Sequence, residues 1–226
     1  LISRINGTNA AFTIHIGDIK NGSSVCDDAY FRRIRGMFDG FEKPLVYTPG
    51  DNEWTDCHRA DNGGYDPLER LAKLREIFFP SPVMSLGRMP MRVESQGAEV
   101  PFTKFIENTR WEKNGVWFAT IHVVGSNNNL QRNQAAVNEY IERNAANLSW
   151  MGSTFALAMK SGAKAVVIAF QADPWFHLDG REDQRSGFSD TVAALKSHAA
   201  KFGKPVLIIH GDQHRLLIDK PLQQSG

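Results

Sequence analysis

The sequence of 226 residues lacks any run of lysines and arginines. Its 26 basic residues nearly balance 25 acidic ones, so it has no positive surface of the kind that nucleic acids and anionic membranes attract. Its apolar runs are far shorter than the roughly 20 residues that span a bilayer. We therefore expect a small molecule as the partner, with no nucleic acid and no membrane.

Two catalytic signatures are also absent. No serine or cysteine lies in a nucleophile motif such as Gly-x-Ser-x-Gly, which argues against a serine or cysteine hydrolase. No glycine-rich dinucleotide fingerprint is found, which argues against a Rossmann oxidoreductase. The apolar fraction of 42% is ordinary for a globular protein. We interpret residues 1–226 as one domain.

The chain does not begin with Met, and residues 1–7 have the pattern of the last turn of a helix closed by Gly7. If this helix leads into a parallel strand at 11–16, another strand should precede it, because parallel neighbours need a helical connection. We therefore expect that the first strand of the domain is missing, and its C-terminal end as well.

The sequence does contain apolar runs that alternate with amphipathic segments. This alternation is typical of an α/β fold with parallel strands. Strands are predicted at 11–16, 44–48, 118–124, 164–170 and 205–210, and helices at 27–41, 66–79, 134–160 and 189–202. A hairpin is expected within 108–124 because Asn114-Gly115 is a favoured turn pair. Residues 80–97 are predicted to be irregular, with short strands such as 91–94.

Polar residues follow several of these strands at the point where each strand ends. Asp18 follows the first, Asp51 the second, Gln171 the fourth, and Asp212 and His214 the last. Ligands of open α/β sheets bind at the carboxyl ends of the strands, so we expect one site rich in oxygen ligands. For Gln171, a ligand and a plain turn residue are both open. The same holds for the loop 125–129, which is either a substrate or metal loop or ordinary turn chemistry.

The two cysteines, Cys26 and Cys57, lie just beyond two strand ends that should be neighbours. We predict that they form a disulfide, and two buried free thiols are the alternative. A bridge would favour an extracytoplasmic location, periplasmic or secreted, because disulfides persist in oxidising compartments.

In order and spacing, the strand endings resemble the motif series of the calcineurin-like metallophosphoesterases. That series is Asp-x-His, Gly-Asp, Gly-Asn-His-Asp/Glu, a histidine at a strand end, and Gly-His-x-His. Gly17-Asp18 and His214 match it directly. The Asp-x-His strand would fall before residue 1. The resemblance implies a four-layer α/β/β/α fold, in which two mixed sheets are flanked by helices.

The remaining motif positions differ from the family pattern. Asp51 stands where the family has a metal-binding asparagine, and Asn52 where it has the catalytic histidine. Gln171 and Asp212 each replace a histidine. The resemblance implies that Asp18 bridges two divalent ions, that His214 binds one ion, and that Asp51, Gln171 and Asp212 bind the other. Because oxygen replaces imidazole, we expect Mg, Mn or Ca rather than Zn.

The implied activity is hydrolysis of a phosphomonoester or phosphodiester by a hydroxide held between the ions. Asn52 cannot act as a general acid, because an amide does not give up a proton as an imidazolium does. His58 in the same loop is the favoured substitute, and His177 and His210 are others. His210, His15 and His122 also fit the pattern of core histidines. The alternative function is that of a degenerate relative that binds a ligand or partner without turnover.

Overall fold

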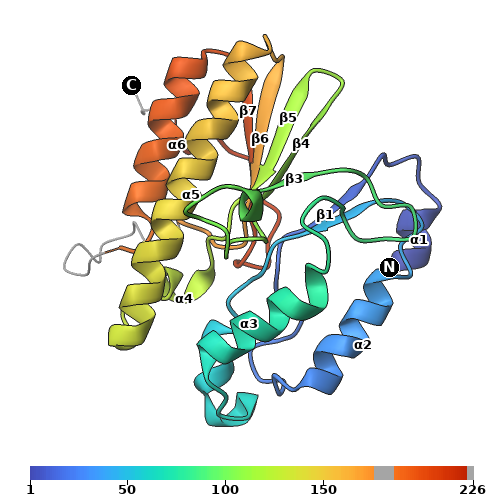
Figure 1. Cartoon of the computed structure of the whole chain (residues 1–226), viewed down its shortest axis with the longest axis vertical. Helices are drawn as coiled ribbons and strands as arrows, with labels where there is room; N and C mark the ends of the chain where they lie inside the picture. The colour runs from blue at the N-terminus through green and yellow to red at the C-terminus, as the bar shows by residue number, and fades with distance from the viewer. Residues whose placement is uncertain (176–185, 223–226) are drawn as a thin grey trace.

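The computed structural model describes residues 1–175 and 186–222 (Figure 1). His177, one of the predicted substitutes for the general acid, lies outside the described residues. The strands are β1 Thr13–His15, β2 Leu45–Tyr47, β3 Glu94–Ser95, β4 Thr109–Lys113, β5 Val116–Thr120, β6 Ala165–Ala169 and β7 Val206–Ile209. The helices are α1 Ile2–Asn6, α2 Asp28–Phe38, α3 Pro67–Phe78, α4 Gly125–Asn128, α5 Gln134–Lys160 and α6 Ser189–Phe202, with 3₁₀ turns η1 Thr55–His58, η2 Ala60–Asn62 and η3 Gln96–Ala98.

The fold is mixed α/β and contains two sheets. The larger sheet has the order β3-β4-β5-β6-β7, in which β5, β6 and β7 are parallel and β3, β4 and β5 are antiparallel. The smaller sheet pairs β1 and β2 in parallel. In Figure 1, α5 and α6 lie along one side of the larger sheet, and α2 and α3 lie on the side of the smaller sheet. A strand lies in each of the five predicted strand segments and a helix in each of the four predicted helical segments, although the ends differ.

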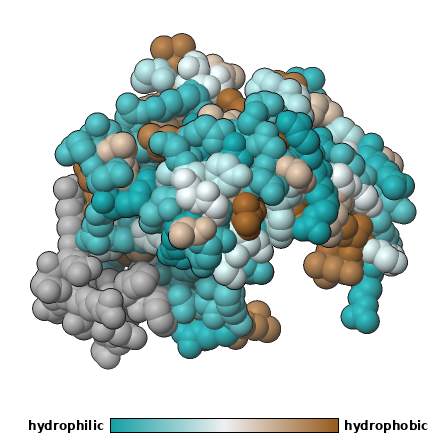
Figure 2. Space-filling model, turned by 90° about the horizontal axis from the view of Figure 1, so that it is seen from below, coloured by the Kyte–Doolittle hydropathy of each residue, from teal (hydrophilic) through white to brown (hydrophobic). Residues whose placement is uncertain are grey.

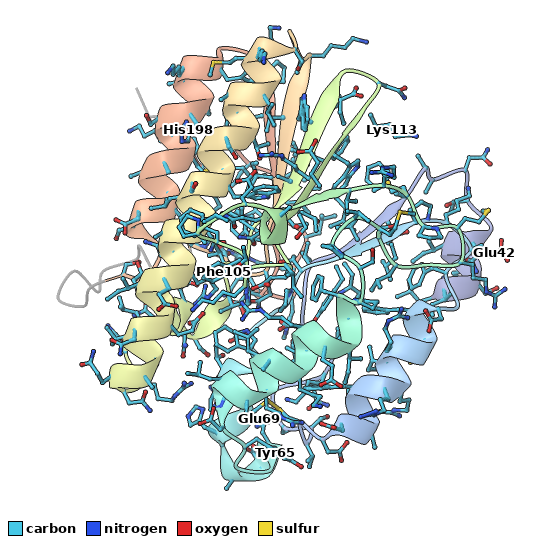
Figure 3. All side chains as sticks on the ribbon, viewed as in Figure 1. Glu42, Tyr65, Glu69, Phe105, Lys113 and His198 are labelled. Atoms are coloured by element: carbon cyan, nitrogen blue, oxygen red, sulfur yellow. A yellow bond between two sulfur atoms is a disulfide. The ribbon has the colours of Figure 1, made fainter. Side chains whose placement is uncertain are left out.

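Local signals account for the helix boundaries. The Asp66 carboxylate caps α3 by accepting from the backbone N–H groups of Leu68 and Glu69, and Pro67 occupies the first turn. Asn133 caps α5 in the same way through Ala136. The two longest helices, α5 and α6, lie side by side, and Figure 3 labels His198 on α6. The His198 ring stacks on Phe155 of α5 at 5.3 Å between ring centroids.

The predicted strand 118–124 is wrong at both ends. The strand starts at Val116 because the tight turn at Asn114-Gly115, where both residues have positive φ, returns the chain directly into the sheet. It ends early because the backbone after Thr120 no longer pairs with β4. The His122 N–H instead donates to the Asn108 side chain, at 2.8 Å from Oδ1. The predicted strand at 91–94 is also shifted, to Glu94–Ser95.

The disulfide prediction is confirmed. Cys26 and Cys57 are bridged, with 5.8 Å between their Cα atoms, and both residues are fully buried. The bridge joins the segment after β1 to η1, so it ties together the two loops that follow the paired strands β1 and β2. A disulfide fits an extracytoplasmic protein.

Hydrophilic residues cover most of the face seen in Figure 2, and the hydrophobic ones on it are scattered. Scattered exposed apolar residues are normal for a folded domain. Within residues 1–175 and 186–222, no helix combines the length and the apolar character needed to cross a membrane.

Candidate metal centre

Three carboxylates from separate strand ends meet at one point. Asp18 follows β1, Asp51 follows β2 and Asp212 follows β7. Each offers a carboxylate oxygen, and these oxygens all lie within 4.8 Å of one another. We call these three residues the carboxylate cluster. The expected convergence of the strand endings is therefore found, and the role of these residues as ligands stays a prediction.

Glycines let the backbone approach these carboxylates closely. A Cβ atom on Gly50 would overlap Asp18 Oδ1 and lie 2.6 Å from the Asp18 backbone nitrogen. A Cβ on Gly125 would lie 2.6 Å from Asp51 Oδ2. Gly17 has a φ of +86° and abuts Gly50. A side chain at Gly50 or Gly125 would have to move the carboxylates of the cluster. The sequence did not predict this role for Gly125.

Gly50→Ala is expected to lower the free energy of unfolding by about 1–3 kcal/mol, because overpacking a fixed site forces its neighbours to move. Gly36→Ala is the matched control. Gly36 lies in α2 with open space around it, so alanine there should stabilise the helix by about 0.5–1 kcal/mol. Urea denaturation of both variants checks this, and equal stabilities would contradict the tight packing at Gly50.

Gln171 lies at the centre of the carboxylate cluster. Its Nε2 donates to Asp18 Oδ2 at 3.1 Å, to Asp51 Oδ1 at 3.2 Å and to Asp212 Oδ1 at 3.2 Å. Its Oε1 accepts from the backbone N–H of Gly125 at 2.7 Å. The nitrogen thus faces the carboxylates and the oxygen faces away from them. Its predicted role as an oxygen ligand would require the amide to turn.

A second layer of polar groups surrounds the cluster. Glu53 is fully buried, and its Oε1 accepts from the Tyr47 hydroxyl at 2.8 Å and from the Gly50 N–H at 2.6 Å. The Ser126 Oγ lies 2.9 Å from both Asp51 Oδ2 and Asp56 Oδ1. The loop 125–129 therefore contacts the cluster through Ser126, which the sequence did not single out.

This loop has a strained backbone. Ser126, Asn127, Asn128 and Asn129 all have φ between +51° and +64°. Left-handed conformations are costly for residues with a Cβ, so the loop needs strong support. The fully buried Arg143 of α5 supplies it by donating to Asn128 Oδ1 at 2.6 Å and to the Asn128 carbonyl at 3.0 Å. The loop is thus held in place beside Asp51.

Burial and mutual repulsion make these acids hard to ionise. Burial raises the pKa of Asp18 to about 8, and the charges of Glu53 and Asp51 add to the rise. Burial likewise raises the pKa of Asp51 to about 6, with help from Asp56 and Asp212. Burial raises the pKa of Glu53 to about 7. A bound cation would offset these costs, because it favours the charged form of each acid.

Without divalent ions, stability is expected to fall by about 2 kcal/mol between pH 6.5 and 8. In this range the folded chain keeps protons on Asp18 and Glu53 that the unfolded chain has lost. Each such proton costs about 1.4 kcal/mol per pH unit as the pH rises. Burial lowers the pKa of His15 to about 4. This histidine makes stability rise with pH, but mainly below its ordinary pKa of 6.5, so it opposes the fall only slightly in this range. Denaturation in EDTA across this range measures the slope, and a stability that rises with pH would contradict it.

The other predicted residues lie outside this group. His58 is exposed, and its Nδ1 lies 2.7 Å from the Thr55 carbonyl in its own turn. His214 is exposed, and it is not among the described side chains whose ligand atoms meet in the cluster. Asn52 is half-buried directly after Asp51. His122 is a core histidine, fully buried with its Nδ1 2.8 Å from Glu107 Oε1.

The carboxylate cluster could hold a metal ion. Its donors are carboxylate oxygens, which suit Mg, Mn and Ca better than Zn. Asp18 Oδ1 is buried and has no hydrogen-bond partner among the described residues, so the site has an acceptor that a cation could use.

No family model matches the chain, and no curated protein and no solved structure matches it.

Proposed function

We propose that this chain is a metal-dependent phosphoester hydrolase similar to the calcineurin-like metallophosphoesterases. The observation that carries the proposal is the grouping of Asp18, Asp51 and Asp212 within 4.8 Å, each from the end of a different strand. The substrate would be a small phosphomonoester or phosphodiester. The disulfide supports a periplasmic or secreted location.

Asp18, Asp51 and Asp212 would hold Mg, Mn or Ca. A bound divalent ion would supply positive charge for the phosphoryl oxygens and lower the pKa of a water molecule. Asp18 would contribute its carboxylate, whose Oδ1 has no other partner among the described residues. The Ser126 hydroxyl would orient the Asp51 carboxylate, and Glu53 would stay engaged with Tyr47 and Gly50 beneath the site. We propose His214 as a further ligand, although it is exposed here.

His58 is the group we propose for proton transfer to the leaving oxygen. The Thr55 carbonyl can only accept, so the His58 ring carries a proton on Nδ1 and leaves Nε2 free to exchange one. Asn52 would position the substrate through its amide, because it cannot serve as an acid.

We also propose that the layers form an α/β/β/α sandwich. Val46 of β2 and Trp111 of β4 belong to one apolar cluster, against which Phe12, Ile14 and Phe118 pack. Contacts between residues of both sheets support face-to-face packing. Helices α5 and α6 would then form one outer layer, and α2 and α3 the other.

The alternative function is binding without turnover by a degenerate relative of these enzymes. One observation favours it: the ligand atoms that meet in the cluster come from carboxylates alone, within the part of the chain that the structure describes. No imidazole stands ready there to move a proton.

The proposal is tested by calorimetric titration with Mn, Mg and Ca together with assays on p-nitrophenyl phosphate and its diester analogue. Binding with ion-dependent turnover supports the hydrolase. Binding without turnover on a broad panel of phosphoesters supports the alternative. The absence of both binding and turnover would overturn the proposal.

A further inference from the structure

We propose that the Gln171 amide nitrogen substitutes for a cation in the carboxylate cluster and must leave before a divalent ion can bind. This inference rests on the proposed metal site and adds a residue that sets its affinity. It makes Gln171 a competitor of the ion and not one of its ligands.

The orientation of the Gln171 amide follows from its partners. Oε1 lies 2.7 Å from the backbone nitrogen of Gly125, which can only donate. Nε2 lies 3.1–3.2 Å from three carboxylate oxygens, which accept when ionised. The reversed amide would set a donor against the Gly125 N–H and its oxygen against three carboxylates. The nitrogen therefore points inward.

The nitrogen and an ion compete for the same acceptors. Divalent ions bind carboxylate oxygens at about 2.0–2.6 Å, closer than the Gln171 nitrogen lies to them. An ion shared by Asp18 Oδ2, Asp51 Oδ1 and Asp212 Oδ1 would take the three acceptors that Nε2 now uses. The two N–H protons also cannot satisfy three acceptors fully, so the amide replaces a cation only in part.

Displacement of Gln171 also affects the strained loop. The Gly125 N–H is buried, and it would lose its acceptor when the amide moves. Gly125 directly precedes the left-handed residues 126–129, whose Ser126 contacts Asp51. Ion binding therefore has to break hydrogen bonds of Gln171 to charged groups and find a new partner for Gly125. Both requirements weaken binding of the ion.

A ligand and a competitor give opposite results when the amide is removed. Methionine has a similar length to glutamine but offers no N–H donor. If Gln171 competes, Gln171→Met should strengthen Mn²⁺ binding by about tenfold or more, because bonds to charged groups no longer have to be broken. If its oxygen were a ligand, the same substitution would weaken binding.

The test is calorimetric titration of the whole chain with Mn²⁺. Gln171→Met and Gln171→Leu are compared with Gln213→Met, which changes a half-buried glutamine next to Asp212 that is not part of the cluster. Tighter binding in either Gln171 variant, with the control unchanged, supports the inference. Equal or weaker binding in the Gln171 variants overturns it.

A double-mutant cycle in EDTA decides the question without any ion. Gln171→Met should lower the urea midpoint in the wild-type background and lower it less in an Asp18→Asn background, because the amide then serves one carboxylate fewer. Additive effects would overturn the inference. If no variant binds Mn²⁺, the proposed metal site fails, while a non-additive cycle still supports the nitrogen as a substitute for a cation.

Discussion

Asp18→Asn is expected to reduce divalent-ion affinity and any ion-dependent turnover by at least about a hundredfold, because it removes charge from the centre of the site. The same variant should be more stable than the wild type in EDTA at pH 8. Asp18 is buried beside Asp51, Asp212 and Glu53, so its ionisation is opposed by burial and by like charges. Relief of this repulsion should raise the free energy of unfolding by on the order of 1 kcal/mol.

The opposite signs of these two effects make the variant informative. A residue that only supports the fold would lose stability and activity together. Asp39→Asn is the matched control, since Asp39 is exposed at the end of α2 and should change neither quantity much. Calorimetry, phosphoester assays and urea denaturation give the three readouts. Turnover that survives Asp18→Asn would mean that the catalytic site lies elsewhere.

Removal of the disulfide is expected to cost about 3–4 kcal/mol of stability. The two cysteines are 31 residues apart, and the entropy of closing a loop of that length in the unfolded chain predicts a loss of this size. The Cys26→Ala/Cys57→Ala double variant avoids leaving a polar atom at these buried positions. Its urea midpoint should fall, and a reductant should lower the midpoint of the wild type but not of the variant.

The bridge should matter for the site as well as for the fold. It ties the segment that follows Asp18 to η1, which follows Asp51 and Glu53. Looser loops should weaken ion binding by about tenfold, because ligands must be held closely in place. Unchanged stability in the double variant would contradict the structural role of the bridge. Unchanged Mn²⁺ affinity in a folded variant would contradict its link to the site.

The sequence predicted those features that depend on local signals. The helices at 66–79 and 134–160 were located from apolar residues at helical spacing, a short-range pattern. Their caps are local as well, because the Asp66 and Asn133 side chains bond within three residues. The cysteine pair was predictable for a related reason. Both cysteines follow strands that a parallel sheet places side by side.

The sequence could not predict features that depend on distant partners. The Gln171 amide is oriented by Gly125, 46 residues away, and by Asp18, 153 residues away. The left-handed loop 126–129 is tolerated because Arg143 on another element holds it. Strand β5 ends early because the side chain of Asn108, from another segment, takes the His122 N–H. None of these contacts leaves a periodic pattern in the chain.

The most direct test of the carboxylate cluster as a metal site is an anomalous diffraction map from crystals soaked in Mn²⁺. We predict a single strong peak bound by oxygens of Asp18, Asp51 and Asp212, with the Gln171 nitrogen displaced from its present position. A map with no peak at these three residues at millimolar Mn²⁺ would contradict the account.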